Sequence, residues 1–237
     1  MKKILSTTAI AGSLCLLGTS AFAQFAGPYV GLSVSAAGVA TEGSKTTNAT
    51  GNGQNTGNAP AGVVTPLAAL DLGYSFAAGK GTTIALGATY NPMKAEFDGK
   101  SPDTTAGATI SRKFEVKDAY TVYIQPTFEI NKDAAFFIKG VYSHAETSLS
   151  GTKVSAPGNL KGWGASTGLR VMLTKDAFIQ AEAAYTQFDS VTARIAEVTA
   201  DTNGENLPAN PRALITRTFT ADKPELVEGR ITLGFKF

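Results

Sequence analysis

The chain has 237 residues, with 21 Lys and Arg against 19 Asp and Glu, and 43% of its residues are hydrophobic. It contains one cysteine and one histidine, so neither a disulfide scaffold nor a Cys/His metal site is expected. No run of Lys and Arg has the pattern of a phosphate-binding surface, which argues against nucleic acid as a partner.

The first 23 residues have the features of a secretory signal peptide. Two lysines follow the first methionine, an apolar stretch covers about 9–17, and Ala-Phe-Ala at 21–23 is a small-residue cleavage site. Cys15 lies in the apolar stretch, so the mature chain has no cysteine. We therefore expect a signal peptide at 1–23 and one domain at 24–237. Because the leader carries two of the lysines, this domain has 19 charges of each sign.

After the leader, apolar residues alternate with small or polar ones at a period of two, and no stretch approaches the ~18 apolar residues of a membrane-spanning helix. Pro126 falls on the apolar face of one segment and weakens one ladder bond there. The pattern predicts eight strands, at 27–38, 63–76, 82–97, 110–130, 135–149, 160–173 and 177–198, with the last one ending the chain.

The predicted connections alternate in length, which is typical of an outer-membrane barrel with short turns on one side and long loops on the other. The short ones are 77–81, 131–134 and 174–177, and the long ones are about 39–62, 98–109, 150–159 and 199–211. The first long segment is rich in Gly, Asn and Thr, so we expect a mobile loop there. Segments 190–199 and 212–221 still alternate, and they predict a hairpin that projects above the membrane.

The aromatic residues fall at two heights along the strands, as expected for girdles at the two membrane interfaces. Close to the short turns are Phe76, Phe128, Phe136, Phe178, Phe235 and Phe237. The girdle expected at the loop side consists of Tyr90, Tyr120, Tyr142, Trp163 and Tyr185. The sequence therefore favours an all-β fold, an eight-stranded antiparallel transmembrane up-and-down β-barrel, over a soluble sandwich.

The opening segment "GPYVGLSVSAAG" and the closing segment "RITLGFKF" resemble the small outer-membrane β-barrel family of Gram-negative bacteria, a porin-type family. The chain is similar to the membrane domain of outer membrane protein A and to opacity and adhesin-type barrels. This resemblance implies location in the outer membrane, contact with lipid and lipopolysaccharide, and a monomer. It also implies that the barrel-assembly machinery reads Phe235 and Phe237 at the C-terminus. The last strand must pair with the first, because an open edge in lipid leaves backbone groups unsatisfied.

The inward face of the predicted strands carries four acids and four bases. They are Asp71, Glu129, Lys139, Arg170, Glu182, Glu228, Arg230 and Lys236. An eight-stranded barrel has an interior just wide enough for side chains, and buried charges there must pair. The favoured interpretation is a salt-bridge plug. The alternative is a narrow pore for ions or small solutes, whereas a wide porin channel is excluded by length.

A lipid-modifying enzyme is the remaining alternative, because some barrels of this fold are lipid A deacylases with a serine two positions after the histidine. Here His144 is followed at that place by Glu146, so the nucleophile is missing. We predict no catalytic residue, no cofactor and no metal. The expected role is structural and surface-interacting: envelope integrity, and loop-mediated adhesion or recognition of a host, phage or cell-surface ligand.

Overall fold

The computed structural model describes residues 24–49, 52–58, 61–102, 109–149, 158–198 and 214–237. The predicted signal peptide lies outside these residues. The described chain is all strand and turn, and no helix in it is long and apolar enough to cross a membrane. The strands are β1 Gly27–Ala49, β2 Asn52–Asn58, β3 Ala61–Gly79, β4 Thr82–Asn91, β5 Ala95–Pro102, β6 Thr109–Glu129, β7 Ala134–Leu149, β8 Leu160–Met172, β9 Ala177–Phe188, β10 Val191–Val198 and β11 Leu214–Lys236.

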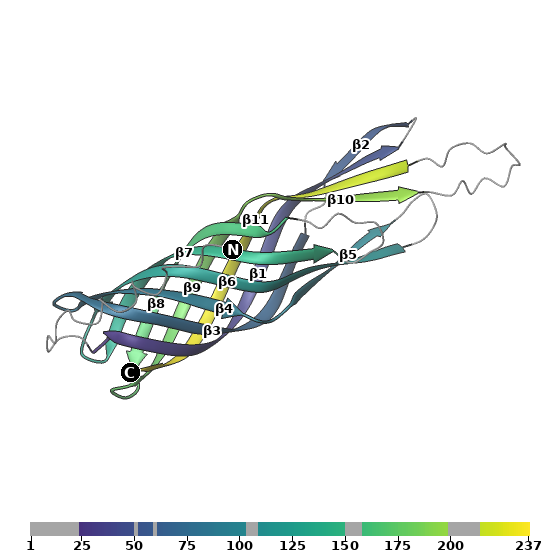
Figure 1. Ribbon diagram of the computed structural model, residues 1–237. Helices are drawn as coiled ribbons and strands as arrows, with labels where there is room; N and C mark the ends of the chain where they lie inside the picture. The colour runs from purple at the N-terminus through teal and green to yellow at the C-terminus, as the bar shows by residue number, and fades with distance from the viewer. Residues whose placement is uncertain (1–23, 50–51, 59–60, 103–108, 150–157, 199–213) are drawn as a thin grey trace, which may run out of the picture.

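Eight of these strands form a closed antiparallel barrel, which confirms the predicted fold class (Figure 1). Each of β1, β3, β4, β6, β7, β8, β9 and β11 pairs with its neighbour in that order, and β11 pairs back onto β1. The closing seam runs without a register shift from Tyr29 opposite Lys236 to Ala40 opposite Glu225. Closure satisfies the backbone groups of both terminal strands, which an open sheet in lipid would leave unpaired.

The long segment 39–62, expected to be a mobile loop, instead contains strand, so this prediction was wrong. β1 continues to Ala49, and β2 folds back onto it with Ser44 opposite Asn58. The upper part of β1 also pairs with β11, from Glu42 to Ala49. Backbone pairing needs no apolar face where both sides of the sheet are in water, so the hydropathy pattern carries little signal for this extension.

Two of the predicted strands, 82–97 and 177–198, are each divided into two shorter strands in the structure. The third ends as β4 at Asn91, and after Pro92 it resumes as β5, which pairs with β6 alone. β3 therefore has β1 as its partner along 61–69 and meets β4 from Leu70 onward. In the stretch of β3 without a β4 partner, the backbone N–H of Ala68 donates to Met93 Sδ, with 3.1 Å between nitrogen and sulfur. Proline cannot donate a ladder bond, which explains the break.

The seventh strand is interrupted at 189–190 and continues as β10. β9 and β10 both pair with β11, and β10 forms the predicted hairpin with residues 214–221. The tip that was expected to cap this hairpin, 199–211, lies outside the described residues. With β1 and β2, this hairpin gives a four-stranded sheet that extends past the end of the barrel (Figure 1).

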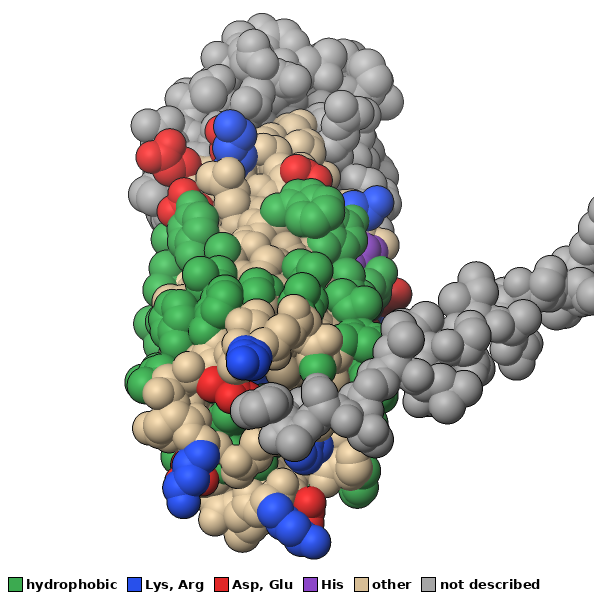
Figure 2. Space-filling model, turned by 90° about the vertical axis from the view of Figure 1, so that its left-hand side faces the viewer, with side chains coloured by type: hydrophobic (Ala, Val, Ile, Leu, Met, Phe, Trp, Pro, Cys, Tyr) green, Lys and Arg blue, Asp and Glu red, His purple; other side chains and the backbone are tan. Residues whose placement is uncertain are grey.

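The two faces of the barrel wall have opposite character. Outward positions carry large apolar side chains such as Leu32 and Leu72, and a band of them covers the middle of the barrel (Figure 2). Inward positions alternate with them and carry small, polar or charged residues such as Ser33, Asp71 and Thr89. This inside-out distribution of polarity is the one that a lipid environment requires.

Candidate functional site

The lumen of the barrel gathers charged side chains that are far apart in the sequence. Asp71, Lys139, Arg170, Glu182 and Glu228 are buried, and Lys139 is 1% exposed. The other three of the eight inward charges, Glu129, Arg230 and Lys236, are partly exposed. Ionisable side chains buried this deeply need polar partners.

Two ion pairs occupy the side of the lumen formed by β7, β8, β9 and β11. Lys139 Nζ lies 2.8 Å from Glu182 Oε2, and Glu182 Oε1 accepts a hydrogen bond from the Ser166 hydroxyl at 2.6 Å. Arg230 donates to both carboxylate oxygens of Glu228, at 2.8 and 3.0 Å from Nη2. Arg230 and Glu182 are directly opposite on β11 and β9, so the two pairs adjoin.

A chain of hydrogen bonds through two tyrosines joins inward side chains of β1, β3 and β6, and Lys139 Nζ lies 4.5 Å from the centre of the Tyr123 ring. The Tyr29 and Tyr123 hydroxyls are 2.7 Å apart, and Tyr123 donates to the Asp71 carboxylate. Asp71 thus has a tyrosine hydroxyl as its partner in place of a base. The alternation of the sequence places Tyr123 on the inner face, and Tyr29 lies two residues from inward Gly31. Neither tyrosine was among the predicted site residues.

Arg170 is stabilised by aromatic faces. Its guanidinium carbon lies 4.3 Å from the centre of the Phe178 ring and 5.1 Å from that of Tyr29. Its Nε donates to Gln180 Oε1 at 2.9 Å, and no described acid lies within ion-pair distance. Arginine suits this position because its planar, weakly hydrated cation stacks on rings. Phe178 was expected in a girdle, but it points inward and is buried, so that assignment was wrong.

Two of the eight charges lie at the short-turn end of the barrel, apart from the ion pairs. Lys236 Nζ donates to the carbonyl oxygen of Gln24 at 2.7 Å and so holds the start of the described chain against its end. The Glu129 side chain lies beside Gly81 in the β3–β4 turn. The eight inward charges therefore fall into three groups. Four form two ion pairs, Asp71 and Arg170 have uncharged partners, and Glu129 and Lys236 lie at the short-turn end of the barrel.

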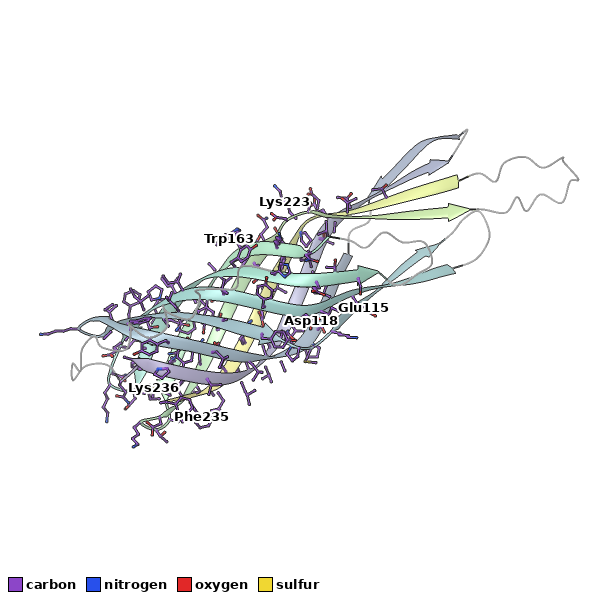
Figure 3. The ribbon with its side chains drawn as sticks, in the orientation of Figure 1. Glu115, Asp118, Trp163, Lys223, Phe235 and Lys236 are labelled. Carbon is purple, nitrogen blue, oxygen red and sulfur yellow. The ribbon has the colours of Figure 1, made fainter. Side chains whose placement is uncertain are left out.

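The residues expected in the loop-side girdle point outward. Tyr90, Tyr120, Trp163 and Tyr185 are exposed, Trp163 to 72%, and the Tyr142 ring packs on it with centroids 4.7 Å apart. The hydroxyls of Tyr90 and Tyr185 donate to Asp118 and Glu225 at 3.1 and 2.9 Å. Figure 3 shows Trp163 and Asp118 far from Phe235 and Lys236, which lie at the turn end.

His144 points outward, where its ring stacks on Tyr120 with centroids 4.8 Å apart. Its Nε2 is 3.3 Å from the Asn159 amide nitrogen, and nearby Glu146 pairs with Lys117 at 3.8 Å. Among the described residues around this histidine, none forms the hydrogen-bonded set of nucleophile, base and acid that a catalytic triad requires. In the described part of the chain, no group of three or more His, Cys, Asp or Glu could hold a metal ion.

The C-terminal residues complete the seam between the last strand and the first. Phe237 donates its backbone N–H to the Pro28 carbonyl at 3.0 Å, and the Lys236 N–H bonds to the Asp176 carbonyl at 2.7 Å. The rings of Phe235 and Phe237 point outward, and Phe237 is 78% exposed. The last residue is thus fixed by its backbone while its side chain remains available.

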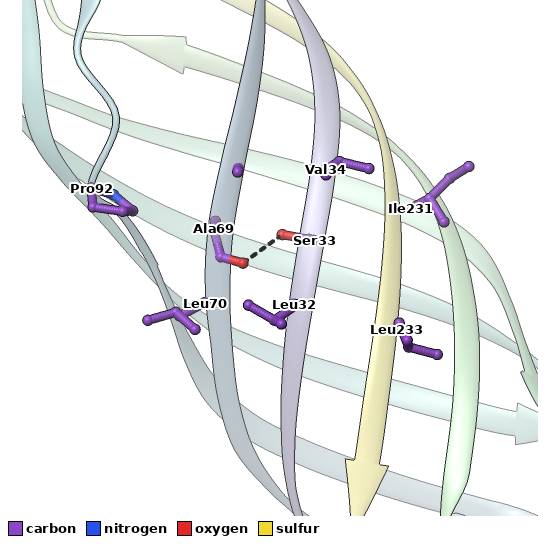
Figure 4. A pocket seen from close by; sticks show the side chains of 9 residues that line it. Leu32, Ser33, Val34, Ala69, Leu70, Pro92, Ile231 and Leu233 are labelled. Atoms are coloured by element: carbon purple, nitrogen blue, oxygen red, sulfur yellow. Dashed lines mark hydrogen bonds between the residues drawn. The ribbon is translucent and has the colours of Figure 1, made fainter.

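An apolar groove of about 430 Å³ runs across the outside of β11, β1 and β3 (Figure 4). The exposed side chains of Leu32, Val34, Leu70, Ile231 and Leu233 line it, with Pro92 at one end. It lies beside the interruption between β4 and β5 and faces the same way as the apolar band. Its lining offers almost no polar atoms, which suits hydrocarbon.

Residues 8–209 match the family model of the outer membrane protein beta-barrel domain. The chain belongs to this family. Family and fold together locate it in the outer membrane and confirm the resemblance seen in the sequence. The curated proteins include no match to this chain.

Solved structures of outer-membrane barrels are similar to this one. OprG from Pseudomonas aeruginosa has a TM-score of 0.51 at 14% identity, over 90% of this chain and 96% of that one. Neisserial surface protein A (NspA) gives 0.43 at 15%, over 89% and 97%. Ail, the attachment invasion locus protein of Yersinia pestis, gives 0.42 at 12%, over 87% and 99%. At such identities the likeness is one of fold.

Proposed function

We propose that this outer-membrane barrel has a structural and surface-interaction role, without covalent chemistry. The observation that carries the proposal is the four-stranded sheet of β2, β1, β11 and β10 beyond the end of the barrel. In it, β2 pairs with β1 and β10 with β11, so each has one edge without a described partner strand. Such edges bind extended peptide segments by strand addition.

The expected partners follow from this placement. Lipid and lipopolysaccharide surround the apolar band and its aromatic rim, and the barrel-assembly machinery inserts the chain through its C-terminal strand. A host, phage or cell-surface ligand binds at the projecting sheet, and nucleic acid has no part. The barrel acts as a monomer, because β11 closes on β1 and the ring of eight strands is completed by one copy of the chain.

Deleting 199–211 from the tip of the β10–β11 hairpin tests this role. Adhesion to host cells, phage adsorption and cell aggregation are expected to fall, while the folded barrel remains in the membrane. The heat-dependent shift of folded barrels on gels is the control for folding. If every surface phenotype survives the deletion with normal barrel levels, the surface role is wrong.

A narrow pore is the second candidate, favoured by the polar lumen and by Arg170, which lacks an acidic partner among the described residues. Single-channel conductance of the refolded protein in a planar bilayer distinguishes the two functions. Small reproducible steps altered by Arg170→Ala or Glu182→Ala would support the pore. A silent bilayer with correctly folded protein would support the plug.

A further inference from the structure

The apolar groove on the outside of β11, β1 and β3 exists because the barrel wall is incomplete beside it. β4 ends at Asn91, so β3 has no β4 partner from Ala69 towards the loops. In this stretch Ala68 lines the groove and lies opposite Val34 on β1. The floor of the groove at this point is therefore a single methyl group, which β4 does not extend far enough to cover.

The groove leads along the outer wall towards the loop side. Leu32 and Leu233, opposite each other across the closing seam, form its end nearer the short turns. Pro92, two residues after Tyr90 of the predicted loop-side girdle, lies at its other end (Figure 4). The long loops of outer-membrane barrels are extracellular, so this end of the groove faces the outer leaflet of the membrane.

The lining of the groove favours an extended hydrocarbon chain. The groove has a volume of about 430 Å³, and apart from Ser33 its lining residues are all apolar. The Ser33 hydroxyl donates to the Ala69 carbonyl at 3.3 Å, so its hydrogen is already used. In a groove an acyl chain contacts the protein on several sides at once, and dispersion attraction grows with the number of such contacts. A chain is therefore bound more tightly here than on a flat part of the wall.

A positive charge lies at the loop-side end of the groove. Lys94 is exposed and follows Pro92 by two residues. Met93, between them, is held by two bonds: its backbone N–H donates to Asn91 Oδ1 at 2.8 Å, and its sulfur accepts from the Ala68 N–H at 3.1 Å. The segment that carries Lys94 is thus fixed against the end of the groove. Lysine binds phosphate as a point charge, and lysines near a membrane surface attract anionic lipids.

We propose that the groove binds one acyl chain of lipid A, the membrane anchor of lipopolysaccharide, and that Lys94 pairs with a phosphate of the same molecule. Lipid A combines phosphate groups with several acyl chains, and it belongs to the leaflet that the loop-side end of the groove faces. The bound chain fills the hollow beside the interruption between β4 and β5. This site is separate from the projecting sheet, so loss of the lipid and loss of surface binding are measured independently.

Native mass spectrometry of the refolded protein with purified lipid A tests the site. The unaltered protein is expected to retain one lipid A when detergent is removed. Ala68→Phe fills the groove with a ring and is expected to weaken binding about tenfold, the effect of uncovering roughly two methylene groups. Lys94→Gln removes the charge and is expected to weaken binding up to about fivefold, as for an ion pair at a surface.

Two matched variants control for changes to the outer wall as such. Ala183→Phe on β9 and Lys161→Gln on β8 alter exposed residues of the same types away from the groove, and both should keep the bound lipid. The heat-dependent gel shift confirms that each variant is folded. Lys94 lies between β4 and β5, so Lys94→Gln decides the question if Ala68→Phe does not fold.

Three results would overturn the proposal. Absence of retained lipid A, or equal affinity of the groove variants and their controls, means that the groove is not its binding site. Equal affinity for phosphatidylethanolamine means that the groove does not select lipopolysaccharide. A protein dimer that Ala68→Phe abolishes means that a second copy of the chain occupies the groove instead.

Discussion

The Tyr123 hydroxyl occupies the space that a side chain at Gly87 would need. The two residues are directly opposite on β6 and β4, and a Cβ atom on Gly87 would overlap the tyrosine hydroxyl and ring. Tyr29 has the same relationship to Gly73. Each ring can therefore lie over the neighbouring strand, so that the two hydroxyls meet and Tyr123 reaches Asp71. Glycine on one strand makes room for the large residue of the next.

Gly87→Ala is predicted to destabilise the barrel by about 1–3 kcal/mol, because the added methyl group overpacks the lumen and displaces Tyr123. Gly229→Ala is the matched control, since a Cβ atom there meets nothing within 4 Å. Urea unfolding in lipid vesicles measures both. Equal stability of the two variants would show that the ring moves without cost.

Removing the two tyrosine hydroxyls is predicted to have unequal effects. Tyr123→Phe leaves the buried Asp71 carboxylate without its donor, which should cost roughly 2–3 kcal/mol. Tyr29→Phe removes one bond between neutral hydroxyls, worth about 0.5–1.5 kcal/mol. Unfolding free energies of both variants check the order. The reverse order would mean that Asp71 is stabilised by another group.

Lys139→Met is predicted to cost about 3–5 kcal/mol, because it leaves the Glu182 carboxylate buried without its cation. Lys139→Met combined with Glu182→Met should recover much of that loss, since an apolar replacement of both partners leaves no isolated charge. The double-mutant cycle by urea unfolding gives the coupling between them. A coupling near zero would mean that Arg230, opposite Glu182, compensates for the lost lysine.

Trp163 reports directly on the position of the loop-side girdle. It is the sole tryptophan of the chain and is 72% exposed on the outer wall. Its fluorescence should be quenched most by lipids brominated near the headgroup, because indole rings favour the interface. If bromine at the acyl-chain end quenches most strongly, Trp163 lies within the hydrocarbon core, and the membrane boundary is closer to the loops than predicted.

Phe237→Ala is predicted to reduce the amount of barrel in the outer membrane without reducing the stability of the folded protein. The ring is exposed, and the residue is held by its backbone bond to Pro28, which alanine retains. Cell fractionation measures the first effect, and refolding with urea titration of purified protein measures the second. A loss of stability equal to that of a lumen variant would assign the ring a packing role instead.

The sequence by itself determined the wall of the barrel. A period of two is the direct consequence of strand geometry, so Leu32, Asp71 and Tyr123 could be assigned to their faces by parity alone. The same parity assigns Phe178 to the inside, but its position near a turn suggested a girdle. The polar extension of β1 escaped prediction because the alternation is weak where both faces of a sheet meet water, whereas the break at Pro92 was overlooked although proline cannot donate a ladder bond.

Only the tertiary structure decided which inward residues meet. Lys139 and Glu182 lie two strands apart in the wall, and Arg170 meets the Tyr29 ring from the far side of the closing seam. Such contacts depend on the stagger and closure of the whole barrel, which strand alternation does not encode. Parity gives a side chain its direction, whereas its partner depends on the relative shift of all eight strands.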